Sequence, residues 1–291
     1  MFSNTRLAFI GSGVMAEAMI KGILDKKLVQ PEQIIPSDPL PERIEELRQR
    51  YGVEGTRDNT YAARSANIVV LSVKPQVLSK VLKELHGLLR PDQLVLSIVA
   101  GARIGSMARQ LGHEAIVRVM PNTPAQVGAG MSVWTTTPAV NEQQKAQAQA
   151  ILQALGEEIF VEEEQYLDMA TAVSGTGPTY VFLMMEALTD AAVHLGFSRR
   201  VALALVIQTV LGSALFAKQS SKHLAELRNM VTSPGGTSAE AIYQLEKGGL
   251  RTVLSKAVWA AYQKSKLLGE MSEKSVEEVP SKPLDTNGEK Q

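Results

Sequence analysis

A glycine-rich segment near the N-terminus, Gly11-Ser12-Gly13-Val14-Met15-Ala16, has the residue types and spacing to bind a phosphorylated ligand. It follows a short apolar run and precedes a helical pattern, which is the context of the G-x-G-x-x-G/A fingerprint. There Gly11 makes the tight turn, Gly13 lets the backbone approach a pyrophosphate, and Ala16 keeps the helix close to the sheet. A turn that is glycine-rich for other reasons is the competing interpretation. We predict a dinucleotide site, to which the helix N-terminus adds N–H groups and a positive dipole.

Asp38 lies where dinucleotide-binding folds place the acidic side chain that hydrogen-bonds the ribose 2′-hydroxyl of NAD. A carboxylate there repels the 2′-phosphate of NADP. Ser37, Arg43 and Asn59 could instead accommodate that phosphate, and Asp38 also fits a turn residue in Ser-Asp-Pro. We therefore predict NADPH or NADH as the coenzyme, with Asp38 and Asn59 in its site, and the residues favour tolerance of NAD without excluding NADP.

Three further segments fall where later strands should end, which is the edge at which parallel sheets bind ligands. Pro75 and Pro124 stiffen two of these segments, and Gly101 permits close approach to the coenzyme. Lys74 fits either a contact with the nicotinamide ribose or exposure to solvent. The coenzyme contacts predicted from these segments are Val73, Lys74, Pro75, Ala100, Gly101, Asn122 and Thr123.

Two more glycine segments lie in the second half, Ser174-Gly175-Thr176-Gly177-Pro178 and Ser233-Pro234-Gly235-Gly236-Thr237-Ser238. Each precedes a helical pattern and carries hydroxyls at cap-like positions, so each is predicted to be a glycine turn that can cradle an anion. Either one alone fits a well-capped turn between helices. Together, after a dinucleotide-binding segment, they favour a small carboxylate substrate.

Composition excludes several classes of function. The chain has no cysteine, which excludes disulfides, thiolate nucleophiles and cysteine-ligated metals, and its 4 histidines show no ligand spacing, so no metal site is predicted. Its 30 basic residues balance 30 acidic ones, so no net field attracts nucleic acid or an anionic membrane. No apolar stretch approaches the roughly 20 residues of a membrane span, and no targeting signal is evident. We expect a cytoplasmic protein without a nucleic-acid or membrane partner.

The elements that would position these residues change in type along the chain. In the first half, apolar runs rich in β-branched residues alternate with helical patterns, which is typical of a parallel sheet wound with helices. The runs lack alternation, which indicates strands covered on both faces. The predicted strands are Arg6–Ile10, Ile34–Ser37, Ile68–Val73, Leu94–Val99, Ile116–Met120 and Ile159–Val161. The predicted helices between them are Val14–Lys26, Pro41–Tyr51, Gln76–Leu89, Ile104–Leu111 and Asn141–Leu155.

From about Gln165 onward the pattern is helical only. The predicted helices are Pro178–Leu195, Arg199–Lys218, His223–Val231, Thr237–Lys247 and Leu250–Leu268. This change predicts an α/β Rossmann-type N-terminal domain over residues 1–164 and a C-terminal all-α domain over residues 165–271. Residues 272–291 are charged and nearly devoid of apolar residues, and we expect a disordered tail there.

Five segments resemble, in order, the successive blocks of the pyrroline-5-carboxylate reductase family. They are Phe9–Gly13, Val73–Gln76, Met120–Ala125, Ala172–Pro178 and Val231–Thr237. The resemblance implies reduction of 1-pyrroline-5-carboxylate to L-proline by NADPH or NADH, the last step of proline biosynthesis. It also implies that the all-α domain is a dimerisation domain interlocking two subunits, in a homodimer that in this family often assembles into a decameric ring.

The resemblance further implies roles for the two later glycine segments. The substrate carboxylate would rest on backbone N–H groups around Gly235–Ser238, and Ser174–Gly177 would complete the pocket. Ser238 Oγ would hydrogen-bond the ring nitrogen, as the candidate catalytic group. Four positions depart from the pattern common in the family: Val14 replaces Asn or Gln, Thr176 replaces Ser, Thr179 replaces Ala, and Ser238 replaces Thr. Ser238 retains a hydroxyl but lacks the methyl group that stiffens threonine.

Two other functions fit parts of this pattern. A reductase of the same architecture could act on another cyclic imine or on a β-hydroxy acid, but the second reaction calls for a lysine that Pro178–Leu195 lacks. A non-catalytic dinucleotide-binding scaffold would bind the coenzyme without oxidising it. The pair of later glycine segments argues against such a scaffold.

Overall fold

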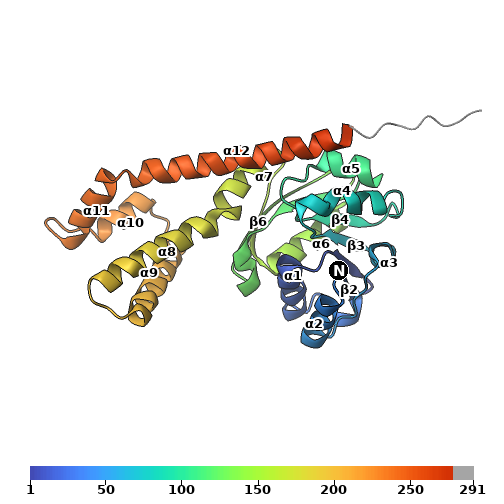
Figure 1. Ribbon diagram of the computed structural model, residues 1–291, viewed down its shortest axis with the longest axis horizontal. Coiled ribbons are helices and arrows are strands. Elements are labelled where there is room, and N and C mark those ends of the chain that lie inside the picture. The colour runs from blue at the N-terminus through green and yellow to red at the C-terminus, as the bar shows by residue number, and fades with distance from the viewer. Residues whose placement is uncertain (278–291) are drawn as a thin grey trace, which may run out of the picture. The chain divides into compact units, whose positions relative to one another are not determined.

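The structure, a computed structural model, describes residues 1–277 of the chain (Figure 1). By packing, these residues form two compact units. One unit combines Met1–Gly175 with residues 262–277, and the other is Thr176–Ala261. The boundaries of these two units differ from those of the predicted domains. The domain limits at residues 164 and 271 stay a prediction.

Within residues 1–277 the first unit contains a seven-stranded sheet in the order β2-β1-β3-β4-β5-β6-β7. The strands are β1 (Leu7–Ile10), β2 (Ile34–Ser37), β3 (Ile68–Leu71), β4 (Leu94–Ser97), β5 (Ile116–Met120), β6 (Gly130–Thr136) and β7 (Gly156–Phe160). All neighbouring pairs are parallel except β5 and β6, which are antiparallel. The sequence analysis missed β6, because its leading glycine and the run Thr135-Thr136-Thr137 are typical of a loop.

The helical segments of the first unit connect these strands. They are α1 (Val14–Asp25), η1 (Pro31–Gln33), α2 (Pro41–Tyr51), α3 (Asn59–Ser65), α4 (Pro75–Glu84), α5 (Ile104–Leu111), η2 (Thr123–Val127), α6 (Glu142–Gln153), α7 (Gln165–Ala170) and η3 (Thr171–Gly175). Helices α3 and α7 were not predicted, since each is shorter than two full turns and shows little periodicity. The predicted Rossmann-type fold of this half is confirmed.

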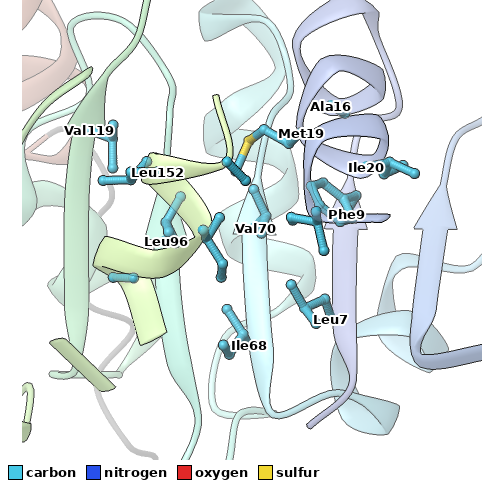
Figure 2. Close-up of a cluster of buried hydrophobic side chains, with 14 of the residues drawn as sticks. Leu7, Phe9, Ala16, Met19, Ile20, Ile68, Val70, Leu96, Val119 and Leu152 are labelled. Atoms are coloured by element: carbon cyan, nitrogen blue, oxygen red, sulfur yellow. The ribbon is translucent and has the colours of Figure 1, made fainter. Parts of the chain in front are cut away.

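The core consists of two hydrophobic clusters, one on each face of the sheet. Successive residues of a strand belong to different clusters, because side chains alternate between the two faces of a sheet. Leu7 and Phe9 of β1 pack in one cluster with residues of α1, α2 and α6. Ala8 and Ile10 pack in a second cluster with residues of α3, α4 and α5. Figure 2 shows the first cluster, in which Met19 of α1 lies over the strands beside Phe9 and Val70. Helices therefore cover both faces, as the unalternating apolar strands predict.

The second unit is entirely helical, and the last helix continues beyond it. Its elements are α8 (Gly177–His194), α9 (Arg199–Gln219), α10 (Leu224–Met230), α11 (Thr237–Lys247) and α12 (Leu250–Glu277), of which α12 ends in the first unit. The tail predicted to begin at Ser272 is helical as far as Glu277. The remainder of that predicted tail, residues 278–291, lies outside the described residues.

Helix α9 carries an unexpected amount of exposed apolar surface. By length and composition alone it is apolar enough to cross a membrane. An 18-residue stretch of this helix has a mean hydropathy of 1.8, and 11% of that stretch is buried inside the protein. The expectation that no stretch reaches this length is therefore wrong, because only small or uncharged polar residues interrupt Val201–Ala217. Phe182 and Leu183 of α8 and Leu205 and Leu211 of α9 are exposed in the isolated chain. These side chains need a covering surface.

Candidate functional site

The glycine turn lies at the point where the order of the sheet reverses, between β1 and β3. Gly11 follows β1 with a φ of +87°, which an L side chain rarely adopts. A Cβ at Gly11 would lie 2.7 Å from Val73 Cγ1 and 3.0 Å from Val73 Cα. Conformation and space therefore both require glycine here. This is the crevice at which open α/β sheets bind ligands.

Gly13 leaves room for a ligand at the start of α1. A Cβ at this position would meet no atom within 4 Å. Within residues 1–277 the N–H of Gly13 has no hydrogen-bond acceptor, and Val14 beside it is exposed. An open backbone donor at a helix N-terminus fits the pyrophosphate of a dinucleotide. Ala16, by contrast, is fully buried in the core below α1.

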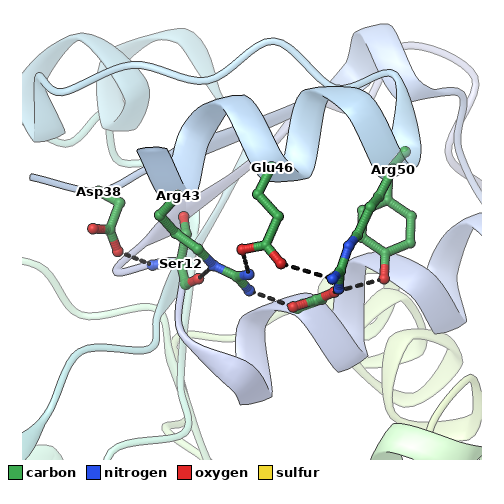
Figure 3. A network of polar contacts seen from close by, with 7 residues as sticks. Ser12, Asp38, Arg43, Glu46 and Arg50 are labelled. Carbon is green, nitrogen blue, oxygen red and sulfur yellow. Dashed lines mark hydrogen bonds and ion pairs between the residues drawn. The ribbon is translucent and has the colours of Figure 1, made fainter. Parts of the chain in front are cut away.

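Ser12 lies between the two glycines, and side chains hydrogen-bond both its N–H and its carbonyl (Figure 3). The N–H of Ser12 donates to Asp38 Oδ2 at 3.0 Å, and Arg43 Nε donates to the Ser12 carbonyl at 2.6 Å. Ser72 Oγ, at the end of β3, donates to the Gly11 carbonyl at 2.6 Å. Ser72 could not be predicted from the sequence, because no local spacing relates it to the turn.

Asp38 fits both interpretations offered for it. Its Oδ1 accepts a hydrogen bond from the N–H of Leu40 at 3.1 Å, as a turn residue does. Its Oδ2 meanwhile contacts the glycine turn, which places the carboxylate at the predicted edge. Asn59, at the start of α3, accepts from Ser37 Oγ at 2.8 Å and donates to Glu84 at 3.0 Å. The predicted ribose residues thus lie around the end of β2.

Glu17 of α1 lies at the centre of an ion-paired cluster below the turn. It receives hydrogen bonds from Arg43, from Arg50 at 2.8 Å and from the Tyr51 hydroxyl at 2.9 Å. Burial alone would raise the pKa of Glu17, but these three donors outweigh burial and hold the pKa below its ordinary value. Burial would lower the pKa of Arg43, and its bonds to Glu17 and Glu46 raise it instead. Both groups are therefore charged at neutral pH.

Other predicted coenzyme residues line a pocket at the next two strand ends. Pro75, Ala100 and Gly101 enclose about 280 Å³ together with Leu268 of α12. Gly101 has a φ of +73°, and a Cβ there would lie 3.2 Å from Leu268 Cβ. The close approach predicted at Gly101 is thus made in the structure by α12. Lys74 precedes α4 and is exposed.

At the end of β5 a predicted coenzyme residue meets a predicted substrate residue. Asn122 Nδ2 donates to the Ser174 carbonyl at 3.0 Å, and its Oδ1 accepts from the N–H of Met131 at 2.8 Å. Gly175 lies so close to Met120 that a Cβ would be 2.5 Å from Met120 Cε. Thr123, next along the chain, begins η2 and is exposed. This contact connects two segments that the sequence analysis assigned to different ligands.

The segment Ser174–Gly177 is not the glycine turn that was predicted. Helix α7 continues into the π-helical η3, and Thr176 keeps helical angles, with a φ of −85° and a ψ of −16°, before α8 begins. Ser174 Oγ donates to the Ala170 carbonyl at 3.0 Å within this helix. Glycine here serves the close packing against Met120 rather than a turn. A π-helical turn often marks a functional position.

The segment Ser233–Ser238 does form the predicted glycine turn before a helix. Gly236 is the N-cap of α11 and its N–H donates to the Ser233 carbonyl at 3.0 Å. Gly235 has a φ of +69°, and open space lies where its Cβ would be. Thr237 and Ser238 occupy the first turn of α11. The geometry of an anion cradle is present, and the substrate roles of these residues stay a prediction.

A buried ionic cluster near α7 was also missed. Arg118, on β5, is almost fully buried and contacts Glu164 at 2.6 Å and Asp168 at 3.6 Å. Ser265 of α12 donates to Asp168 at 3.0 Å. The sequence could have indicated this cluster, because a charged residue inside the buried strand Ile116–Met120 requires an oppositely charged partner. Within residues 1–277 no group of histidine and carboxylate side chains is arranged to hold a metal ion.

Two family models match the chain. The model described as pyrroline-5-carboxylate reductase dimerisation matches residues 164–268. The model described as NADP oxidoreductase, coenzyme F420-dependent, matches residues 6–101. The first match covers α8, α9 and α11, and the second covers the glycine turn and the segments around Asp38, Val73 and Gly101.

Relatives and solved structures agree with these matches. A pyrroline-5-carboxylate reductase of Synechocystis is 43% identical over 91% of this chain and 99% of its own. One of Pseudomonas aeruginosa is 41% identical over 92% of this chain and 98% of its own. Among solved structures, a pyrroline-5-carboxylate reductase of Coxiella burnetii has a TM-score of 0.84 at 37% identity, covering 91% and 99% of the two chains. A pyrroline carboxylate reductase of Plasmodium falciparum with NADP bound also has a TM-score of 0.84, at 34% identity, covering 91% and 98%.

Proposed function

The chain belongs to the pyrroline-5-carboxylate reductase family, and we propose that it reduces 1-pyrroline-5-carboxylate to L-proline at the expense of NADPH or NADH, the last step of proline biosynthesis. The observation that supports this most directly is the bond between Asn122 and Ser174 at the end of β5. It joins the edge that would hold a nicotinamide to the segment that would hold a small acid. An imine reductase needs the two ligands side by side.

The residues of the glycine turn fit a dinucleotide. Gly11 and Gly13 let the backbone approach the pyrophosphate, and the N–H groups of Gly13, Val14 and Met15 at the start of α1 face it. Asp38 and Asn59 lie where a ribose would be bound. The proposed coenzyme contacts continue through Val73 to Pro75, Ala100, Gly101, Asn122 and Thr123. When bound, the reduced nicotinamide supplies the hydride.

The chain's part in the chemistry is to orient the imine. A protonated ring nitrogen makes the neighbouring carbon electrophilic, so no general base is needed at that carbon. In our proposal the substrate carboxylate rests on backbone N–H groups around Gly235–Ser238, those of Gly235, Thr237 and Ser238, since the N–H of Gly236 donates to the Ser233 carbonyl, with Ser174–Gly177 as a second wall. Ser238 Oγ accepts a hydrogen bond from the ring nitrogen and turns the carbon toward the coenzyme. The role of Ser238 is therefore to position a proton and a ring.

Contacts between subunits would cover the exposed apolar helices. The match to a dimerisation model and the similarity to pyrroline-5-carboxylate reductases support a homo-oligomer acting on a small molecule. We propose a homodimer, assembling further into a decamer, in which α8 and α9 meet a second chain. These helices line an open groove of about 720 Å³ with Phe182, Leu183, Leu203 and Ile207. The domains that we propose are residues 1–164 for the coenzyme and 165–271 for substrate and dimerisation, followed by a tail over 272–291.

We further propose a cytoplasmic protein without a nucleic-acid or membrane partner. Equal numbers of acidic and basic residues support this. Helix α9 passes a test of length and composition for a membrane span, but it lies inside the matched dimerisation region. A partner subunit covers such a helix as well as lipid would.

The experiment follows the absorbance of NADH and of NADPH separately, each with pyrroline-5-carboxylate and with its six-membered homologue. We expect rapid oxidation with the five-membered imine and formation of proline. Oxidation only with the six-membered ring would replace the substrate, and binding of coenzyme with no oxidation in any combination would identify a scaffold. A strong preference for NADPH would overturn only the argument that Asp38 disfavours a 2′-phosphate.

A further inference from the structure

Arg43 contacts the glycine turn from the side opposite to Asp38. It comes from the first turn of α2, and its Nε donates to the carbonyl of Ser12 at 2.6 Å. The side chain is 17% exposed, so the bond is shielded from water. Arg43 is thus the side chain that fixes the carbonyl between Gly11 and Gly13.

The other nitrogens of Arg43 are already committed to carboxylates. Nη1 contacts Glu46 at 2.6 Å and Nη2 contacts Glu17. Arg50 and Tyr51 hold Glu17 in turn (Figure 3). Arg50 also pairs with Glu46, so two carboxylates balance two guanidinium groups and the cluster offers little net charge to a 2′-phosphate. This arrangement argues against the sequence-based alternative in which Arg43 accommodates the phosphate of NADP.

Holding the Ser12 carbonyl also sets the direction of a donor. In a trans peptide the C=O and the following N–H point in opposite directions, and every described peptide bond is trans. When Arg43 draws the Ser12 carbonyl toward α2, the N–H of Gly13 turns to the other side. That N–H has no acceptor within residues 1–277, and it borders the open space at Gly13.

The preceding peptide is held in the same manner. Asp38 accepts from the N–H of Ser12, and Ser72 donates to the carbonyl of Gly11. Each peptide that Ser12 shares with a glycine is therefore oriented by a side chain. The glycines themselves supply no such restraint, since they adopt many backbone conformations.

We propose that Arg43 is a positioning residue for coenzyme binding: through the Ser12 carbonyl, it aims the N–H of Gly13 at the pyrophosphate without touching the coenzyme. This inference rests on the proposed function of the turn. The pyrophosphate is common to NADH, NADPH and ADP-ribose. Loss of Arg43 therefore weakens all three by the same factor, whereas loss of a 2′-phosphate ligand would weaken NADPH alone.

The test measures dissociation constants of the three ligands by fluorescence or calorimetry for wild type, R43M and R48M. Arg48 lies on the same helix, is 61% exposed and pairs with Glu45, so R48M is the matched control. We expect R43M to weaken all three ligands about tenfold, the effect of losing one charge-assisted hydrogen bond. We also expect the KM for coenzyme to rise by that factor while kcat at saturating coenzyme is unchanged. R48M should bind as wild type does.

R43K keeps the charge, but its donors lie on a single nitrogen, which cannot take the places of Nε, Nη1 and Nη2 at the Ser12 carbonyl, Glu46 and Glu17 together. We expect it to bind as weakly as R43M, and it decides the question if R43M fails to fold. Unchanged binding by R43M, weakening confined to NADPH, or full recovery in R43K would each overturn the inference. Wild type that binds neither NADH nor NADPH would instead overturn the proposed function.

Discussion

The two glycine turns each contain a glycine with a positive φ, Gly11 and Gly235, and are supported in opposite ways. Gly11 has a φ of +87° and lies against Val73, and side chains from α2 and the ends of β2 and β3 hold its neighbours. Gly235 has a φ of +69° with open space around it, and its turn is closed by the local bond from Gly236 to Ser233. The turn at Gly11, where we propose that the coenzyme binds, is therefore held by contacts within one chain. The turn at Gly235, where we propose that the substrate binds, leaves a surface for a ligand or a second chain to cover.

The largest effect that we expect comes from blocking assembly. Leu211 is exposed on α9. In the variant L211D a dimer would bury an unpaired carboxylate at this position, and burying that charge costs roughly 3–5 kcal/mol. We predict monomers with about 100-fold lower reductase activity and unchanged NADH affinity. Light scattering and coenzyme titration check this.

The control is I159D, which places the same charge at an exposed position on the edge strand β7. It should leave assembly and activity intact. Loss of NADH binding together with activity in L211D would show that the coenzyme site also depends on the second chain, and the contrast between the turns would disappear.

The second prediction compares the two glycines directly. G11A suffers the strain of a positive φ and a clash with the Val73 backbone, so we expect a loss of about 3 kcal/mol in the free energy of unfolding. G235A suffers the strain alone, about 1 kcal/mol. Urea midpoints measure both. Equal losses would mean that the contact with Val73 relaxes and that the first turn is no more rigid than the second.

The third prediction concerns Ser238 in the open turn. S238A removes one hydrogen bond to a charged ring nitrogen, and we predict about a tenfold fall in kcat/KM for the imine. Coenzyme affinity should not change, because in our proposal Ser238 contacts the imine and not the coenzyme. S238T, which keeps the hydroxyl, should restore activity. An S238A enzyme with full activity would remove the hydroxyl from the mechanism.

The smallest effect is a pH dependence of stability at the rigid turn. The pKa of Glu17 is lowered in the folded chain from an ordinary value of 4.5, so its ionised form stabilises the fold above that value. The contribution is lost as the pH falls through the folded pKa, below 4.5. We predict that E17Q is less stable by about 1 kcal/mol at pH 7, and that the difference shrinks below pH 4.5. A difference in melting temperature that does not shrink as the pH falls below 4.5 would contradict this.

The contrast between the turns also separates what sequence can predict from what it cannot. Gly11–Ala16 could be assigned because glycine spacing, a preceding strand and a following helix all lie in one short stretch. Arg43 and Ser72 contact that turn from distant parts of the chain, and no local pattern connects them. Ser174–Gly177 was assigned to a turn because π-helical backbone has no composition of its own. Strand β6 was lost for a related reason, since its threonines are equally typical of loops.

The shared helix α12 has a consequence for the order of folding. Residues 262–277 pack with Met1–Gly175, where Leu268 closes on Gly101 and Ser265 bonds Asp168. These residues follow the whole helical unit Thr176–Ala261 in the chain, so during synthesis the sheet waits for its final helix until that unit has been made. Until then Asp168 lacks one hydrogen-bond donor and the apolar groove beside Gly101 is uncovered. A chain truncated before Tyr262 would leave the sheet without these contacts permanently.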